Sequence, residues 1–218
     1  NSADSPYLTK TFGADGGDTW TFSLWIKRGK ITSGGNRYFF SEAGGSGIGF
    51  VDGTDKLRFY NASSVVDSTQ VFRDVGGWYH FVFSNNAGTV TITVNNTAVE
   101  IGSTQATLFN RNNAWHIGSY SDTGNNFDGY MAEMHWIDGT ALAPTSFGET
   151  NDDGVWVPKK YTGSYGTNGF YITGEDSSDL GADYSGNGND FTSSGLTSDD
   201  QVSDSPTLNF PVISPIDY

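Results

Sequence analysis

The chain of 218 residues contains no cysteine, so no disulfide framework is available and small cross-linked secreted scaffolds are excluded. No apolar run approaches the roughly 20 residues needed to cross a bilayer, and the first residues do not resemble a signal peptide. No window shows a sustained apolar period of about 3.6 residues, which argues against a helical bundle. The sequence begins at Asn1 without methionine, and we expect it to be a processed or excised piece of a longer protein.

Basic residues are also scarce. Lys and Arg total 11 against 25 Asp and Glu, which gives a formal net charge of −14. Phosphate binding relies on clustered Lys and Arg, so this field repels nucleic acid and anionic membrane surfaces. The same field favours solubility and raises the local concentration of cations. We therefore expect neither a nucleic-acid partner nor membrane insertion.

Aromatic residues, by contrast, make up 15% of the chain, and glycine occurs 29 times. In residues 78–101 (WYHFVFSNNAGTVTITVNNTAVEI), two runs of aromatic and β-branched residues flank the turn SNNAG. Val90, Ile92 and Val94 alternate with polar residues, which is the pattern of a half-buried strand. A second turn at Asn95 and Asn96 leads into another short run. The stretch predicts three antiparallel strands.

Similar strand patterns recur at fairly even spacing between turns rich in glycine. They fall at residues 19–28, 37–42, 47–51, 56–61, 113–120 and 127–138. In the first run, alternation predicts an apolar face made of Trp20, Phe22, Leu24 and Ile26. In the last run, it predicts a face shared by Tyr130, Ala132, Met134 and Trp136. One short helical turn is expected at residues 144–149.

From about Gly174 the chain becomes acidic and rich in Gly, Ser and Asp. Composition alone is typical of a linker or tail, yet scattered apolar residues are spaced like anchors of a loop wrapped on a sandwich. These anchors are Leu180, Tyr184, Phe191 and Leu196. No core-forming run remains for a second domain. We expect one domain over residues 1–218, with residues 174–218 as a wrapped loop and an extended C-terminal arm.

Three segments together resemble the laminin-G-like and pentraxin-like branch of the concanavalin A-like jelly rolls. TWTFSLWIKRG resembles the early strand of that family with its embedded tryptophan, and WYHFVFSNNAGTVTITVNN resembles its hairpin. IGSYSDTGNNFDGYMAEMHWIDGTALAPTSF is similar to the closing strand and the helical turn after it. The resemblance covers roughly residues 18–148. It implies an all-β fold, an antiparallel two-sheet β-sandwich of the concanavalin A-like jelly-roll type.

One segment departs from that family pattern. In many such domains a text like DYSGNGND precedes the early strand, whereas here it lies near the C-terminus, at residues 183–190. It could be the first strand of the jelly roll, displaced by permutation, or the start of another copy. This placement, with the text of residues 138–172, also resembles structural or tail-fibre proteins of marine bacteriophages. That second resemblance implies a virion context.

The same segment carries an oxygen side chain at every second position, namely Asp183, Ser185, Asn187 and Asn189. Calcium takes six to eight oxygen ligands on a flexible loop, and this spacing can wrap one ion. The alternative is a turn in which Asn and Asp bond to their own backbone. Related jelly rolls often carry calcium at a loop edge, so the resemblance implies Ca²⁺ as the candidate cofactor. Further candidates, better explained as plain turns, are Asp52, Asp55, Asp122, Asn125 and Asp128.

The residue patterns typical of glycosidase and serine-hydrolase active sites are incomplete in this sequence. Glu133 and His135 face the same way on one predicted strand. Glucanases of the resembled fold need alternating carboxylates there, and His135 stands where one is required. Glu133 is better explained as an acceptor of hydrogen bonds from a neighbouring strand or loop. His80 and His116 lie in strand patterns without a nucleophile elbow, so we expect no enzyme.

Aromatic side chains are the remaining route to function, because sugars stack on Trp or Tyr while Asp and Asn bind hydroxyl groups. Tyr38 and Tyr60 lie beside turns, although we expect most aromatic residues to fill the core. The predicted ligand site consists of Trp115, Tyr120, Asp122 and Asn125.

These patterns favour a non-catalytic binding module of a virion or extracellular fibre that recognises cell-surface glycans. The alternative is a structural decoration or assembly domain of a phage particle that contacts a neighbouring virion protein and binds no sugar. A homo-oligomer is compatible with both interpretations.

Overall fold

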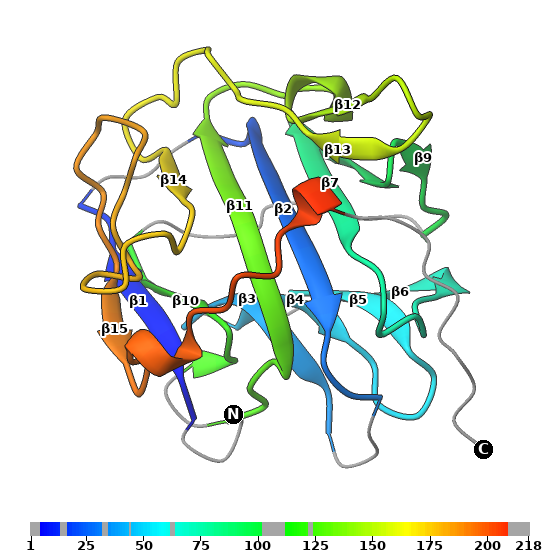
Figure 1. Cartoon of the computed structure of the whole chain (residues 1–218), viewed down its shortest axis with the longest axis horizontal. Helices are drawn as coiled ribbons and strands as arrows, with labels where there is room; N and C mark the ends of the chain where they lie inside the picture. The colour runs from blue at the N-terminus through cyan, green and yellow to red at the C-terminus, as the bar shows by residue number, and fades with distance from the viewer. Residues whose placement is uncertain are drawn as a thin grey trace.

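The computed structural model describes most of the chain, namely residues 5–13, 17–31, 35–43, 45–61, 64–101, 112–121 and 124–208. Two large antiparallel sheets pack face to face as a β-sandwich, which confirms the predicted all-β jelly roll (Figure 1). None of the helices in these ranges has the length and apolar character needed to span a membrane.

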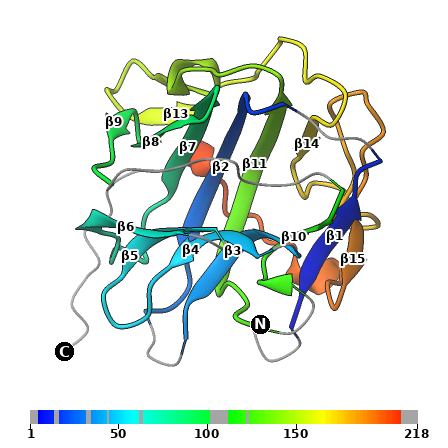
Figure 2. The ribbon, with the colours of Figure 1, turned by 180° about the vertical axis from the view of Figure 1, so that it is seen from behind.

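One sheet has seven strands in the order β15-β1-β10-β3-β4-β5-β6. Figure 2 shows β3 to β6 from the side opposite to the view in Figure 1. The strands of this sheet are β1 (Tyr7–Thr11), β3 (Arg37–Glu42), β4 (Ser46–Phe50), β5 (Lys56–Asn61), β6 (Ser64–Val71), β10 (Ala114–Ile117) and β15 (Thr192–Ser194).

The second sheet has six strands in the order β14-β11-β2-β7-β8-β9. Its strands are β2 (Trp20–Arg28), β7 (Tyr79–Asn86), β8 (Thr89–Val94), β9 (Thr97–Ala98), β11 (Gly129–Asp138) and β14 (Phe170–Ile172). The smaller elements are the hairpin of β12 (Gly148–Thr150) and β13 (Trp156–Pro158), and the 3₁₀ turns η3 (Pro144–Ser146), η4 (Ser198–Asp200) and η5 (Pro206–Leu208).

The three strands predicted from residues 78–101 are β7, β8 and β9. Ala87 and Gly88 connect the first two with φ of 48° and 92°, and Asn95 and Asn96 connect the next two with φ of 46° and 63°. Positive φ at both central residues is the turn geometry that matches the twist of a hairpin. Gly88, Asn95 and Asn96 tolerate this region, whereas Ala87 adopts it without that advantage.

The core between the sheets is strongly aromatic. Trp20, Phe22, Leu24 and Ile26 all belong to it, as alternation predicts. The rings of Trp20 and Trp136 stack with centroids 4.7 Å apart, within the range favoured for aromatic pairs. Other aromatic pairs join the two sheets, such as Phe22 of β2 and Phe40 of β3, whose rings stack with centroids 4.3 Å apart.

A β-bulge in β11 changes which of its residues face the core. Ala132 pairs with Trp25 but His135 pairs with Ser23, so β11 carries one extra residue at Glu133, whose φ is +50°. Met131 packs against the core on the near side of the bulge, and Tyr130 is 39% exposed. The expectation that Tyr130 and Ala132 share a face with Met134 and Trp136 is therefore wrong, because the bulge shifts the alternation by one residue.

The C-terminal segment adds strands to both sheets. β14 pairs with β11, and β15 pairs with β1. Of the predicted anchors, Phe191 is buried in the core and Leu196 packs against it, whereas Tyr184 is 49% exposed. The expected arm at residues 209–218 lies outside the described residues.

Two layers cover the outer face of the six-stranded sheet. Residues 139–169 lie over one end, where Phe147 and Tyr165 form a second small core with Val82 and Ile137. Residues 196–208, which we call the C-terminal strap, cross the front of this sheet in Figure 1. Asp204 ties the strap down through an ion pair of 2.7 Å with Lys27. The seven-stranded sheet has no comparable layer over β3 to β5 among the described residues.

Candidate functional site

The outer face of β3, β4 and β5 carries polar and aromatic side chains. The middle strand, β4, contributes almost no side chain to this face. Phe59 and Ile48 pair across the sheet and point into the core. Alternation then sends the residues at Gly47, Gly49, Arg58 and Tyr60 to the outside. Because Gly47 lacks a side chain, the rings of Tyr38 and Tyr120 can occupy the space above β4.

Three tyrosine rings gather above β4, and we call them the tyrosine face: Tyr38, Tyr60 and Tyr120. The Tyr120 ring lies 4.8 Å from Tyr38 and 6.2 Å from Tyr60, centroid to centroid. A Cβ atom at Gly47 would come within 2.8 Å of the Tyr38 ring, so glycine is needed for that ring to lie flat on the sheet. Tyr38 is buried, whereas Tyr60 and Tyr120 are half-buried and present their free surface to solvent.

A paired arginine borders the tyrosine face. Arg58 donates to Asp67 through two hydrogen bonds, Nε to Oδ1 at 2.7 Å and Nη2 to Oδ2 at 2.8 Å. This bond to Asp67 raises the pKa of Arg58, while burial raises the pKa values of Tyr38 and Tyr120. Tyr38 and Tyr120 are therefore neutral near pH 7, and each tyrosine hydroxyl can both donate and accept a hydrogen bond.

Two of the predicted ligand residues lie beside these rings. Asn125 is exposed, adopts φ of +54°, and its carbonyl oxygen accepts a bond of 3.0 Å from the Tyr38 amide. Tyr120 is part of the tyrosine face itself. At the same end, the Asn36 amide reaches the Tyr38 hydroxyl at 3.5 Å. Asp122 lies outside the described residues.

The prediction that Trp115 contacts a ligand is wrong. Its side chain is 0% exposed and belongs to the central core. Its ring packs edge-on against Phe12 at 4.9 Å and Trp136 at 4.6 Å. Since β10 alternates, Trp115 points inward while His116 occupies the outer position, and no face of the indole is open to a sugar.

The predicted calcium loop is held together by its own hydrogen bonds. Oδ1 of Asp183 accepts from the amides of Tyr171 and Ser185, and Oδ2 accepts from the Ser185 hydroxyl and the Asn189 amide, all at 2.8 Å. The side-chain nitrogens of Asn187 and Asn189 both donate to the carbonyl of Gly169, at 2.9 and 2.8 Å. This arrangement leaves few oxygen lone pairs for an ion that needs six to eight, so it favours the turn interpretation. Calcium binding stays a prediction.

Glu133 accepts a hydrogen bond from a neighbouring strand, as expected. The Tyr171 hydroxyl donates to its Oε2 at 2.7 Å, and Nε2 of His135 lies 3.8 Å away. Burial raises the pKa of Glu133, but hydrogen bonding with His135 and Tyr171 outweighs it and lowers the pKa overall. His135 in turn contacts the Tyr165 hydroxyl at 2.9 Å through Nδ1. Glu133 is thus bound into the sheet by Tyr171 and His135.

A serine and a histidine do meet, although the sequence patterns gave no sign of it. Ser23 Oγ lies 2.8 Å from His80 Nε2, and Trp156 Nε1 lies 2.9 Å from His80 Nδ1. An indole N–H can only donate, so Nδ1 accepts and Nε2 carries the proton. His80 therefore donates to Ser23 and cannot take its proton, which leaves this buried pair without nucleophilic chemistry.

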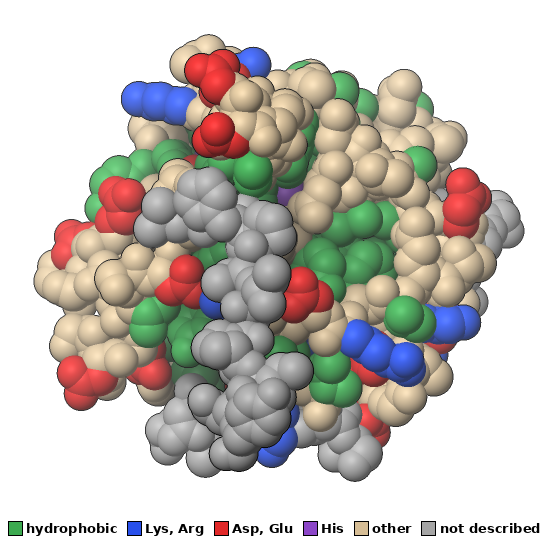
Figure 3. Space-filling model, turned by 45° about the vertical axis from the view of Figure 1, so that its right-hand side comes forward, with side chains coloured by type: hydrophobic (Ala, Val, Ile, Leu, Met, Phe, Trp, Pro, Cys, Tyr) green, Lys and Arg blue, Asp and Glu red, His purple; other side chains and the backbone are tan. Residues whose placement is uncertain are grey.

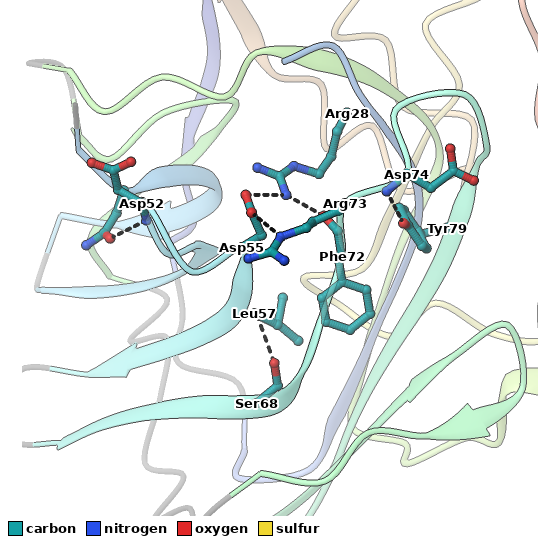
Figure 4. A network of polar contacts seen from close by, with 10 residues as sticks. Arg28, Asp52, Asp55, Leu57, Ser68, Phe72, Arg73, Asp74 and Tyr79 are labelled. Atoms are coloured by element: carbon teal, nitrogen blue, oxygen red, sulfur yellow. Dashed lines mark hydrogen bonds and ion pairs between the residues drawn. The ribbon is translucent and has the colours of Figure 1, made fainter. Parts of the chain in front are cut away.

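Asp52 and Asp55, two further candidates for cation binding, lie in a network of arginine contacts and turns (Figure 4). Asp55 accepts from Arg28 at 3.0 Å and from Arg73 at 2.8 Å. Arg28 also donates to the carbonyl of Phe72. Asp52 accepts from the Gly35 amide at 2.9 Å. Asp55 is thus a structural counter-ion that fixes the turn between β4 and β5.

The part of the chain that carries the tyrosine face also matches a family model, described as the concanavalin A-like lectin/glucanases superfamily, over residues 2–146. The chain belongs to this superfamily. No curated protein matches it. Membership agrees with the resemblance drawn from its three strand segments, and residues 147–218, with the DYSGNGND loop, lie beyond the matched region.

The chain is also similar to several solved structures. A Bacteroides ovatus protein described as carbohydrate-binding matches with a TM-score of 0.58 at 16% identity, over 88% of this chain and 56% of that one. The chain thus spans little more than half of that protein. A heptameric pentraxin from Limulus polyphemus (TM-score 0.47, 15% identity) matches over 64% of this chain and 72% of its own. Domain 4 of an extracellular arabinanase from Geobacillus stearothermophilus matches with a TM-score of 0.47 at 22% identity, over 63% of this chain and 68% of that domain's chain.

Sequence patterns alone did not single out Tyr38, Tyr60, Arg58 and Asp67 as one site. Each lies in a strand, and they meet only through the registers of β3 with β4, β4 with β5, and β5 with β6. The one available signal was the alternation of glycine with Ile and Phe in SGIGF, since glycine in a strand often marks a close approach.

Proposed function

We propose that this domain is a non-catalytic module that binds glycans on the tyrosine face. The observation that carries the proposal is the gathering of Tyr38, Tyr60 and Tyr120 above Gly47, with Tyr60 and Tyr120 partly open to solvent. Pyranose rings present apolar C–H faces that stack on tyrosine, and the solvent-facing sides of Tyr60 and Tyr120 can receive a sugar ring.

Polar groups at the edges of the tyrosine face orient a bound ligand. The Arg58–Asp67 fork offers donors and acceptors that are already held in place by their mutual bonds, so little side-chain entropy is lost on binding. Asn125 is exposed at the other end of the face, beside the Tyr38 strand. A ligand with hydroxyl groups around a flat apolar ring matches this arrangement.

The charge of the chain narrows the class of glycan. The formal net charge is −14, and acidic side chains are spread around the face shown in Figure 3 rather than gathered in one patch. An anionic polysaccharide would be repelled at long range, and the one arginine of the tyrosine face is already paired with Asp67. We therefore expect neutral or amino sugars to be preferred over uronic or sialic acids.

Membership of a superfamily of lectins and glucanases supports the proposal, as does the fold shared with a Bacteroides ovatus protein described as carbohydrate-binding. The absence of catalysis is part of the proposal. Two carboxylates lie beside the tyrosine face, and both are bound within the protein: Asp67 is held by Arg58, and Glu42 accepts a hydrogen bond from Asn113. The location on a virion or extracellular fibre also stays a prediction.

A role in assembly is the second candidate. Val65 and Val71 lie about half exposed on β6, the last strand at one edge of the seven-stranded sheet, where apolar surface can pair with another subunit. A glycan array with neutral, cationic and anionic members, combined with analytical ultracentrifugation, separates the two roles. Binding to neutral or amino glycans by a monomer supports the proposed function. Stable oligomers without glycan binding support assembly.

A further inference from the structure

A cleft between the two sheets lies apart from the tyrosine face. It has a volume of about 460 Å³ and opens where the two sheets part, between β1 and the first half of β11. Its floor is apolar and comes from both sheets: Leu8, Ile117, Phe127, Met131 and Met134. None of the tyrosine-face residues lines it. Its size falls within the usual range for a small-molecule site.

The cleft exists because a strand is too short to fill it. β14 pairs only with Met134, His135 and Trp136 of β11. Residues 129–132 of β11 line the cleft instead of pairing with a further stretch of β14. The bulge at Glu133 sits at this boundary and turns Met131 toward the core. Both methionines of the chain therefore border the cleft, and their flexible thioether side chains can adapt to an apolar guest.

The rim of the cleft carries acidic side chains. The C-terminal strap contributes Asp199, Asp200 and Asp204, and no lysine or arginine is among the described residues that line the cleft. Asp204 is neutralised by Lys27 at 2.7 Å, and Asp200 accepts from Thr197. Asp199 is exposed and makes no hydrogen bond or ion pair with the part of the chain that the structure describes. Its carboxylate is available to a ligand.

Aromatic side chains lie at the same rim. Tyr130 is exposed above the cleft, and the Trp78 indole donates to Asp204 at 3.4 Å. Carboxylates and aromatic rings together are the groups that attract ammonium and guanidinium ions. The apolar floor, in turn, favours a ligand with a hydrocarbon body.

We propose that this cleft binds a small amphiphilic cation, an apolar body carrying an ammonium or guanidinium group. The body lies between Ile117 and the two methionines, and the cationic group lies against Asp199 beneath the strap. A fatty acid of the same size would meet the acidic rim with its carboxylate and is repelled. A free sugar has no hydrocarbon body to replace water on the floor.

The two methionines make a direct test possible. With ¹³C-methyl methionine labelling, the full chain gives two methyl signals, from Met131 and Met134, and both report on the cleft. The probe is hexyltrimethylammonium, with heptanoate as the anionic match. We expect saturable shifts of both signals with the cation, half-complete at or below roughly 1 mM, and binding of heptanoate at least about tenfold weaker. No saturable shift with either probe, or equal binding of both, would overturn the proposal.

Two variants tie the binding to the rim. Asp199→Asn removes the free carboxylate at an exposed position. It should weaken binding of the cation roughly twofold to fivefold, since exposed charge pairs contribute little binding energy. Asp153→Asn removes the same charge from the exposed β12–β13 hairpin, which is not part of the cleft, and should leave affinity unchanged. Equal weakening by both variants would show long-range attraction by net charge alone and would overturn the assigned site.

Discussion

Trp156 on the β12–β13 hairpin donates its indole N–H to Nδ1 of His80, 2.9 Å away on the outer face of β7. This contact holds the covering layer onto the six-stranded sheet and fixes His80 as the neutral tautomer with its proton on Nε2. The imidazole also lies parallel to Trp25, with ring centroids 4.7 Å apart. Protonation of His80 would therefore break the bond to Trp156 in a site that excludes water.

Stability should fall as the pH drops from 7 to 5. Burial and then the neighbouring His135 lower the pKa of His80 from 6.5 to about 3. The unfolded chain then binds the proton first, so the stabilisation is present above about pH 6.5 and declines toward pH 3. Between pH 7 and pH 5, we expect His80 alone to lower the free energy of unfolding by about 2 kcal/mol, measured by urea unfolding. Burial lowers the pKa of His135 too, which adds a loss of the same sign.

His80→Gln is the matched variant for that pH effect. Glutamine can accept from Trp156 and donate to Ser23 but does not titrate. The free energy of unfolding of the variant should depend less on pH between 7 and 5, by about 2 kcal/mol. An unchanged pH dependence in the variant would place the titrating group elsewhere.

Asp55→Asn should destabilise the fold strongly. Arg28 and Asp55 form a buried ion pair in which the carboxylate is 5% exposed, and the Arg28 guanidinium lies 4.5 Å above the Phe50 ring. Removing one charge leaves Arg28 buried without its counter-ion, at a cost of about 3–5 kcal/mol in urea unfolding. Asp67→Asn is the control, because its carboxylate pairs with Arg58 but is 29% exposed, and the expected loss stays below about 1 kcal/mol. Equal losses in both variants would contradict the buried role of Asp55.

Asp183→Asn tests the two interpretations of the DYSGNGND loop. Four groups donate to the Asp183 carboxylate, and the variant loses the acceptors for two of them, so we expect the melting temperature to fall by roughly 5–10 °C. If the loop is a hydrogen-bonded turn, calcium and a chelator give the same melting temperature for each protein. A calcium-dependent rise in the wild type that Asp183→Asn abolishes would instead establish the predicted calcium site.

Alternation along the strands predicted the fold well, because one face of each strand must be buried. It failed at β11, where the bulge at Glu133 places a non-glycine residue at positive φ that no local pattern indicates. Trp115 was misassigned because a four-residue strand carries too short a pattern to say which side faces the core.

The candidate site was only partly predictable for a different reason. Tyr120 and Asn125 stand beside a turn and were recognised, but Tyr38 and Tyr60 join them through pairing across three strands. Pairing register is set by tertiary contacts and by the bulge after Tyr38, and neither is visible in a single sequence. The DYSGNGND loop could not be assigned from the sequence either, because the same residues are compatible with a hydrogen-bonded turn and with a calcium site.

Glycan binding by tyrosine variants tests the proposed function most directly. Once an array has identified a bound neutral or amino glycan, isothermal titration calorimetry compares the wild type with Tyr60→Ala and Tyr120→Ala. Tyr184→Ala is the control, since it removes an exposed tyrosine that is not part of the tyrosine face. A glycan site on this face predicts at least about tenfold weaker binding for the first two variants and unchanged binding for the third. Unchanged affinity in Tyr60→Ala and Tyr120→Ala, with both variants folded, would contradict it.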